Sequence, residues 1–419
     1  MPASRGGSPK SRQDKGRGGI KAGALPLFSA QEVAAFTLPL GEAGARLRQV
    51  LEEHGCAIVT GVAGEEDCRR LEGHFAQDLG GLIDKAAVER SGSSAVKRDA
   101  EAALQDPRTL SLETSKLLGD MERCQLRGLP HGSFAWACRL LPSVRRCYEA
   151  IHDTADLVSS CDNPFFAPAE HEEAFENRSW PHVDHNSNDR RLYDDLGQAV
   201  GDWEVYQGLL YVWGSESSRA STTVVLPGSH RTAYPAIMAD PSAVERGRKG
   251  AHCTRLSVLA NTQLASALQD SWLRGAGRVP VPRGGLFLWS SRTLHQGWSG
   301  GPRLAQPVCW EPAGRRDDAT LDRKMRLAAL GLPSTHWASL GIPHTLVAPR
   351  PCSATAPCEQ GKVALPLRAS IQPASLRPGG RSVGELWEAL QDGLWEAHMP
   401  AALRESVAES ICPEILAAL

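Results

Sequence analysis

The sequence lacks a long apolar segment and lacks an excess of charge of either sign. No apolar run approaches the roughly 18–20 residues that a membrane-spanning helix needs, so we expect no membrane partner. Among 419 residues the formal net charge is -2, which gives no reason to expect nucleic acid as a partner. A hydrophobic content of 42% with 22% charged residues is ordinary for a globular protein that buries a sizeable core.

The cysteines lack the spacing of a disulfide framework or of a structural zinc site. The 11 cysteines are scattered, odd in number and not preceded by a secretory signal. They favour reduced thiols in an intracellular, cytoplasmic protein. Cys352 and Cys358 have no second cysteine or histidine pair at zinc-finger spacing. Residues 1–24 are rich in Gly, Ser, Pro, Lys and Arg and predict a disordered basic tail, for which organelle targeting stays an alternative.

The hydrophobic pattern changes from a helical to a strand-like period near residue 158. Before this point the sequence predicts a helix at 45–54 that stops at Gly55, a buried strand at 56–62, a second helix at 65–79 and mainly helical structure over 97–157. After it come short β-type runs at 205–213, 223–226, 277–281, 285–290 and 304–310. Helices followed by many short strands predict an α+β fold whose β part is a sandwich or barrel.

Two further segments stand outside this strand pattern. Residues 240–276 interrupt the strands with helical character and resemble an insertion. Residues 346–419 begin as a Pro/Ala/Ser-rich linker and end in an amphipathic helical region at 383–419. We therefore divide the chain into a tail at 1–24, a main domain at 25–345 and a C-terminal extension at 346–419.

The stretch WPHVDHN combines ligand-type residues at a spacing that suits a metal. His182 and Asp184 are two positions apart, so on an extended segment their side chains point to the same side. His295 ends a β-type run roughly 110 residues later in LFLWSSRTLHQGW. Two imidazoles and one carboxylate on one face are the ligands of non-haem iron(II) oxygenases. Arg303 opens the next strand, where its planar guanidinium suits the far carboxylate of 2-oxoglutarate.

Each of these residues has an ordinary structural reading when it is taken alone. A His-x-Asp sequence arises by chance, His295 could be a core histidine and Arg303 a surface ion-pair partner. Their joint order and spacing on β-type segments favour the iron site. His185 should point to the opposite face, as a residue behind the ligands or facing the substrate. The polar stretch 186–204 is either a mobile lid or a solvated loop.

These residues resemble the phytanoyl-CoA dioxygenase-like family of Fe(II)/2-oxoglutarate oxygenases. The likeness covers roughly residues 45–345 and rests on HVDHN, VVLPGSHR at 224–231, GLFLWSSRTLHQGW and the strand that begins with Arg303, with HGCAIVTGV as an opening strand. A narrower likeness exists to an uncharacterised microbial and algal subgroup, through Gln207-Gly208, Arg292-Thr293-Leu294-His295 and Ser334-Thr335-His336-Trp337. Where the family commonly has Gly-Asp, this sequence has Gly284-Gly285, which we expect to alter only a turn.

The resemblance implies a double-stranded β-helix, a jelly roll, that begins near residue 158 with helices packed outside. It assigns iron to His182, Asp184 and His295 and the 2-oxoglutarate carboxylate to Arg303, with no catalytic residue beyond the metal centre. Gln207 and Thr293 are further cosubstrate candidates. The turn at Pro227-Gly228-Ser229-His230 is expected to be structural. Trp180, Trp289 and Trp298 are expected to bury the site.

The implied activity is a 2-oxoglutarate-dependent dioxygenase that hydroxylates a small organic metabolite with dioxygen and releases succinate and carbon dioxide. Ascorbate is its expected reductant. Two other interpretations stay open: a non-catalytic jelly-roll binding protein, and a metal-dependent cupin enzyme that does not use 2-oxoglutarate. The sequence gives no Lys/Arg cluster beside the motifs that would mark a CoA or nucleotide phosphate site, and Arg190-Arg191 reads as a loop neutralised by its own aspartates.

Overall fold

The computed structural model describes residues 25–89, 92–111, 114, 129–168, 179–192, 204–341, 398–411 and 413–419. The predicted basic tail, the predicted linker, residues 383–397 of the predicted helical region and residues 193–203 of the polar stretch lie outside these ranges. Among the described helices, none is both long and apolar enough to cross a membrane. The cysteines in the described ranges carry free thiols: Cys56, Cys68, Cys138, Cys147, Cys161, Cys253 and Cys309.

The N-terminal part is mostly helical and begins with a capped turn. Its elements are α1 (Ala30–Val33), η1 (Ala34–Phe36), β1 (Thr37–Pro39), α2 (Leu40–His54), β2 (Cys56–Thr60), α3 (Glu65–Glu89), α4 (Ser94–Gln105), η2 (Pro107–Thr109), α6 (Ser133–Arg139) and α7 (Pro142–His152). The helix α2 ends at Gly55, whose φ of 71° is left-handed and favours glycine, so the predicted stop is confirmed. Helix α3 runs ten residues past its predicted end at residue 79.

The remaining elements are mainly short strands. They are β3 (Leu157–Ser159), β4 (Phe165–Ala167), β5 (His182–Val183), η5 (Arg190–Leu192), β6 (Tyr206–Tyr211), β7 (Thr222–Val225), α8 (Ser229–Thr232), α9 (Tyr234–Met238), α10 (Pro241–Arg248), β8 (Thr254–Arg255), η6 (Leu256–Val258), α11 (Thr262–Gly275), β9 (Gly277–Arg278), β10 (Gly285–Ser290), β11 (His295–Trp298), β12 (Arg303–Pro307), β13 (Trp310–Pro312), η7 (Ala313–Arg315), α12 (Asp318–Leu330), α16 (Ala401–Ser410) and α17 (Pro413–Ala418).

Within the described ranges the strands form two main sheets and a small third one. A six-stranded sheet has the order β1-β2-β10-β6-β12-β4, and a five-stranded sheet has the order β8-β5-β11-β7-β9. Apart from the parallel pair of β1 and β2, the named strands pair antiparallel. From β9 to β12, consecutive strands alternate between the two sheets. The predicted combination of helices with antiparallel sheets is therefore confirmed.

Two predicted strands are shorter than the sequence suggested. The run at 277–281 contributes only β9, because Pro280 and Pro282 cannot donate to a neighbouring strand. The run at 304–310 divides into β12 and β13 on either side of Val308 and Cys309. Strand β12 ends at Pro307, which has no N–H, and β13 pairs instead with β3 in the two-stranded sheet.

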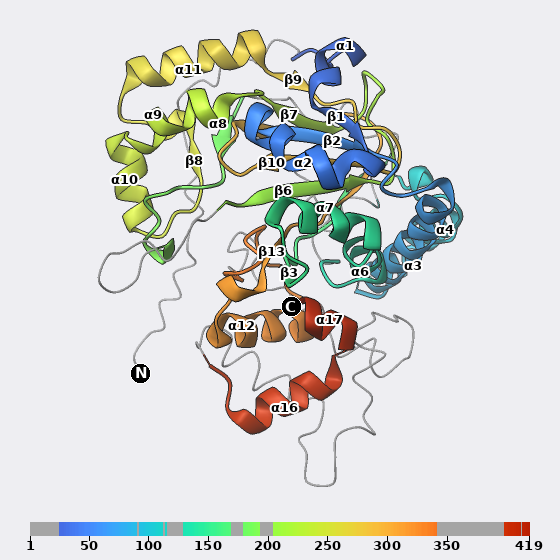
Figure 1. The fold of residues 1–419 in the computed structure, drawn as a ribbon. Helices are drawn as coiled ribbons and strands as arrows, with labels where there is room; N and C mark the ends of the chain where they lie inside the picture. The colour runs from blue at the N-terminus through green and yellow to red at the C-terminus, as the bar shows by residue number, and fades with distance from the viewer. Residues whose placement is uncertain are drawn as a thin grey trace, which may run out of the picture.

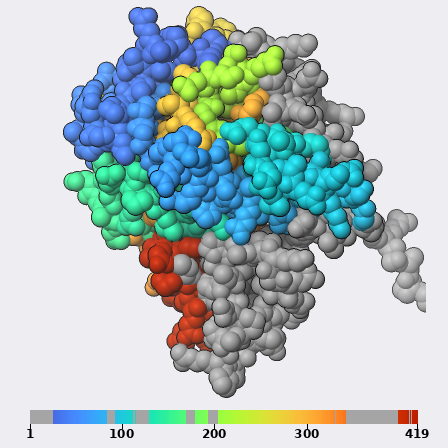
Figure 2. Space-filling model, turned by 90° about the vertical axis from the view of Figure 1, so that its right-hand side faces the viewer, coloured from blue at the N-terminus to red at the C-terminus, as the bar shows by residue number. Residues whose placement is uncertain are grey.

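Helices cover the outer faces of the sheets (Figure 1). Helices α2 and α7 pack on each other over the six-stranded sheet, and their buried side chains join its main hydrophobic core. Helices α10 and α11 belong to the predicted insertion, and α9 directly precedes it. The three helices lie together beside the five-stranded sheet, over a second core that includes Val183, Val224 and Trp272. Figure 2 shows α3 and α4 covering one side of the molecule, with the C-terminal helices below them.

Candidate metal centre

Strand pairing brings the three predicted metal ligands together. His182 in β5 and His295 in β11 are direct cross-strand partners, so both side chains leave the five-stranded sheet on one face. Asp184 follows β5, and its peptide N–H donates to the carbonyl of Ser291 at 2.9 Å. The ligand atoms of His182, Asp184 and His295 all lie within 4.8 Å of one another, as a metal site requires.

Backbone carbonyls fix the orientation of both imidazoles. The Nδ1 of His182 lies 3.3 Å from the carbonyl oxygen of Trp180, and the Nδ1 of His295 lies 2.9 Å from that of Thr293. A proton on each Nδ1 satisfies these carbonyls and leaves each Nε2 lone pair free for a metal. The two Nε2 atoms lie 3.5 Å and 3.2 Å from the Asp184 carboxylate oxygens.

The charges of the site suit a cation. Burial opposes ionisation of Asp184, but the attraction of the neighbouring His182 and His295, which acts when these imidazoles carry a proton in place of a metal, outweighs it and holds the pKa of that carboxyl well below its usual range. Burial lowers the pKa of His182, which favours its neutral, metal-binding form. The amide Nε2 of Gln207 in β6 donates to Asp184 Oδ2 at 3.0 Å. Gln207 therefore orients the carboxylate, whereas the sequence had assigned it to the cosubstrate.

The prediction that Thr293 lines the cosubstrate pocket is not supported. Its hydroxyl donates to the carbonyl of Gly55 at 2.8 Å, and Thr293 is absent from the cavity lining. The sequence argument placed Thr293 on the strand face of His295, but β11 begins only at His295. Thr293 belongs to a turn in which its N–H donates to the carbonyl of Ser290, so the alternation of a strand does not apply.

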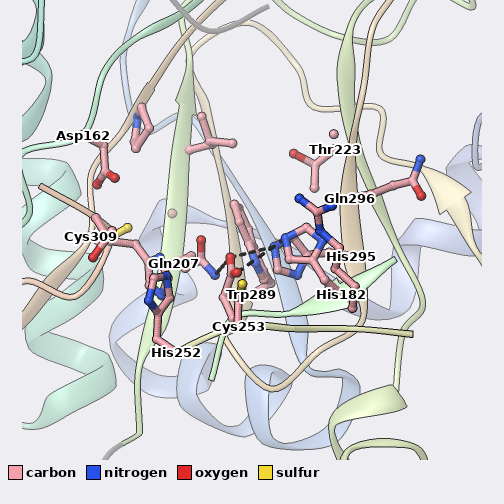
Figure 3. Close-up of a pocket in the computed structure, with 18 of the residues that line it drawn as sticks. Asp162, His182, Gln207, Thr223, His252, Cys253, Trp289, His295, Gln296 and Cys309 are labelled. Atoms are coloured by element: carbon pink, nitrogen blue, oxygen red, sulfur yellow. Dashed lines mark hydrogen bonds and ion pairs between the residues drawn. The ribbon is translucent and has the colours of Figure 1, made fainter. Parts of the chain in front are cut away.

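The cavity beside these ligands lies between the two sheets and has a volume of about 580 Å³. The five-stranded sheet contributes His182, His295 and Thr223, and the six-stranded sheet contributes Gln207, Trp289 and Arg303. Figure 3 shows Asp162 and Cys309 on the opposite side of this cavity from His182 and His295. Burial raises the pKa of Asp162 to about 6, against the opposing hydrogen bond from Ser160.

Arg303 is buried in the same cavity without a counter-ion. Its side chain is 1% exposed, and its Nη2 donates to the Tyr211 hydroxyl at 3.2 Å. Its Nε and Nη1 have no hydrogen-bond partner, and no carboxylate of the described residues forms an ion pair with it. The guanidinium lies 4.4 Å from the Phe165 ring centroid. A buried cation with two free donors is suited to bind an anion.

Two of the three predicted tryptophans shield the ligands. The ring of Trp180 stacks on His182 at 4.7 Å with an interplanar angle of 12°, and the ring of Trp289 lies 5.3 Å from His295. Both line the cavity, whereas Trp298 does not. Trp298 packs instead against the core under α11, with Arg278 over its ring.

The second histidine of HVDHN points away from the candidate ligands. His185 is 2% exposed and packs against Trp337 and Tyr234, with ring centroids 5.2 Å and 6.0 Å away. His185 is not part of the cavity lining. Its side chain therefore lies on the opposite face from the ligands, as predicted, and a substrate-facing role is not supported. In the described part of the loop after it, Arg191 pairs with Asp189, as the self-neutralised reading expected.

The turn at residues 227–230 has structural contacts. Gly228 adopts a φ of 77°, and its N–H donates to the carbonyl of His54 at 2.7 Å. His230 contacts the carbonyl of Glu52 through Nε2 at 3.0 Å. The turn thus attaches the five-stranded sheet to the end of α2, which agrees with its predicted structural role.

Several cavity residues carry polar groups that sequence reasoning did not assign. They are Asp162, Arg246, His252, Cys253, Arg255 and Thr335, with His336 from the quoted STHW segment. The buried Nε2 of His336 and Oγ1 of Thr335 have no hydrogen-bond partner. Apart from Thr335 and His336, none of them belongs to a motif, so only the packing of the sheets and insertion identifies them.

No protein-family model matches the chain, and no curated protein sequence matches it. Solved structures that partly resemble the chain include EctD from S. alaskensis with 2-oxoglutarate and 5-hydroxyectoine (11% identity, 69% of this chain and 78% of that chain covered, TM-score 0.37). Another is GlcNAc Inducible Gene 2 from Candida albicans (11% identity, 90% of this chain and 88% of that chain covered, TM-score 0.43). A third is a putative oxidoreductase from Salmonella typhimurium LT2 (11% identity, 74% of this chain and 79% of that chain covered, TM-score 0.42). All three TM-scores lie below 0.5, and function is therefore inferred from the site alone.

Proposed function

We propose that the protein is an Fe(II)- and 2-oxoglutarate-dependent dioxygenase that hydroxylates a small organic molecule. The observation that carries the proposal is the joint presence, in one cavity, of the His182, Asp184 and His295 cluster and the unpaired guanidinium of Arg303. Two imidazoles and a carboxylate suit iron(II) and leave coordination positions open. The free donors of Arg303 suit the far carboxylate of 2-oxoglutarate.

We also propose that the two sheets form a double-stranded β-helix of the phytanoyl-CoA dioxygenase-like kind, within a catalytic unit spanning residues 25–345. Alternation of consecutive strands between two facing sheets supports this interpretation. In this arrangement the metal ligands come from one sheet and Arg303 from the other, and the cosubstrate lies between them.

The protein's own residues would prepare the site for the reaction. When bound, iron(II) and 2-oxoglutarate supply the activation of dioxygen, with release of succinate and carbon dioxide. His182 and His295 present Nε2 because backbone carbonyls hold their Nδ1 protons. Gln207 holds one carboxylate oxygen of Asp184. Trp180 stacks on the His182 ring and excludes water from that side.

The proposal predicts succinate formation by purified protein supplied with iron(II), ascorbate and 2-oxoglutarate in air. Asp184→Asn keeps the size of the side chain but removes its charge, so we expect loss of both succinate formation and tight iron(II) binding. His74→Ala is a matched control because His74 lies on α3, outside the cavity lining.

Three outcomes separate the candidate functions. Succinate formation that disappears only in Asp184→Asn supports the dioxygenase. Tight binding of 2-oxoglutarate without turnover under any substrate supports a non-catalytic binding protein. Iron(II) binding that needs Asp184 without any binding of 2-oxoglutarate supports a cupin enzyme of another type.

A further inference from the structure

Arg255 stands in the same row of the sheet as the candidate metal ligands. His182 in β5 is the cross-strand partner of His295 on one side and of Arg255 in β8 on the other. Direct cross-strand partners project from the same face of a sheet. The side chain of Arg255 therefore leaves the sheet on the cavity face, one strand beyond His182, and it lines the cavity.

Arg255 is connected to the site through an aromatic stack. Its guanidinium carbon lies 6.0 Å from the ring centroid of Trp180, and Trp180 stacks on His182. Arg255 is exposed, and no carboxylate of the described residues pairs with it. The guanidinium is thus held at the cavity mouth with its hydrogen-bond donors available.

A second arginine at the mouth is also without a counter-ion. Arg246, in the last turn of α10, is exposed and lines the cavity, and no carboxylate within the described ranges pairs with it. Arg191 differs, because it is neutralised by Asp189 and donates to the Gly250 carbonyl at 2.7 Å. His252 adds no charge at neutral pH, since burial lowers its pKa.

We propose that the substrate carries an oxyanion, a carboxylate or a phosphate, which Arg255 and Arg246 bind at the cavity mouth. The reaction of this substrate rests on the proposed function, but its binding does not. Arg303 lies in β12 of the other sheet. The cosubstrate carboxylate and the substrate oxyanion would therefore bind to different arginines. An anion held beside Trp180 would fix the distance from the charged end of the substrate to the metal.

The test is a binding titration by calorimetry with three aromatic probes at low ionic strength. Phenyl phosphate and benzoate carry the two oxyanions, and benzyl alcohol is the uncharged control. The protein is loaded with Mn(II) and saturating 2-oxoglutarate, which occupies Arg303, and a second series uses metal-free protein. We compare wild type with Arg255→Gln, Arg255→Lys and Arg246→Gln. Arg274→Gln is the matched control, since Arg274 is exposed on α11 outside the cavity.

We expect Arg255→Gln to weaken binding of the oxyanion probes tenfold or more, because it removes charge-assisted hydrogen bonds. Arg246→Gln should weaken binding of the oxyanion probes severalfold. The affinity of Arg255→Lys should lie between those of wild type and Arg255→Gln, and Arg274→Gln should bind the probes as wild type does. The tighter of the two oxyanions identifies the group. Benzyl alcohol binding as tightly as the anions, displacement of the anions by 2-oxoglutarate, or unchanged affinity in Arg255→Gln would each overturn the inference.

The two proposals fail separately in this experiment. If 2-oxoglutarate does not bind, but Arg255→Gln still binds phenyl phosphate more weakly than wild type in the metal-free series, the dioxygenase proposal is contradicted and the oxyanion site is supported. If 2-oxoglutarate binds normally and Arg255→Gln retains phenyl phosphate, only the oxyanion site falls.

Discussion

Replacement of Arg303 by methionine should separate the role of this residue in binding from its effect on stability. The guanidinium is 1% exposed, and two of its donor atoms, Nε and Nη1, have no partner. Each unsatisfied buried donor costs about 1–3 kcal/mol, so the two together cost roughly 2–6 kcal/mol in the protein without 2-oxoglutarate. Methionine removes this cost, but it loses the hydrogen bond from Nη2 to Tyr211, about 1.5–3 kcal/mol, and about 0.5–2 kcal/mol of cation–π attraction to Phe165.

These gains and losses are of similar size, so the unliganded variant Arg303→Met should be about as stable as wild type. Binding of 2-oxoglutarate should weaken, because two charge-assisted hydrogen bonds of about 1.5–3 kcal/mol each are lost. This corresponds to a decrease in affinity of roughly 10²–10⁴-fold. Urea unfolding of the Mn(II)-loaded protein with and without 2-oxoglutarate measures both effects, since ligand at 100 times Kd adds about 2.7 kcal/mol to the free energy of unfolding.

Arg139→Met is the matched control, because Arg139 is equally buried but hydrogen-bonded. Its Nη1 and Nη2 donate to the carbonyls of Pro130 and Asp162, both at 2.6 Å. Its replacement leaves buried acceptors unpaired and should destabilise the protein by about 2–4 kcal/mol. The reasoning is refuted if Arg303→Met is destabilised as much as Arg139→Met, or if it still binds 2-oxoglutarate with wild-type affinity.

Three further predictions concern the support of the site and the fold. Gln207→Ala frees the Asp184 carboxylate to rotate, and titration with iron(II) should show metal affinity about 10–100-fold lower. Burial raises the pKa of Asp78 from 3.8 to about 7, so the folded state binds its proton more tightly than the unfolded state. The free energy of unfolding should fall by roughly 3 kcal/mol as pH rises from 4 to 7, relative to Asp78→Asn in parallel urea titrations, and an identical slope in both proteins would contradict this. Gly55→Ala places a Cβ against the His230 ring and 2.6 Å from the Thr293 hydroxyl, at a left-handed φ, so the thermal midpoint and the metal affinity of the variant should both drop. A drop in the midpoint alone would show that Thr293 does not transmit the change to the site.

The candidate ligands could be predicted because the type and the spacing of these residues can both be read from short stretches of sequence. The spacing of His182 and Asp184 needs only an extended backbone, and His295 and Arg303 each stand at the edge of a strong β-type run. The structure places Thr293 in the turn before β11 and not in the strand, because the start of a strand cannot be read to one residue from sequence. Gln207 was placed near the site, but its partner depends on where β6 lies across the cavity from Asp184.

The insertion at 240–276 shows which information the sequence did not contain. From its pattern it was an interruption of the strands, whereas in the fold it supplies β8, the end of α10 and the loop between them to the cavity. This contribution depends on the pairing of His182 with Arg255 across 73 positions of sequence. A one-residue slip in that pairing would turn Arg255 to the opposite face of the sheet. The register of a two-residue strand thus decides whether Arg255 reaches the cavity mouth. The insertion is therefore the part of the chain in which changes of sequence should alter substrate choice while leaving the metal ligands in place.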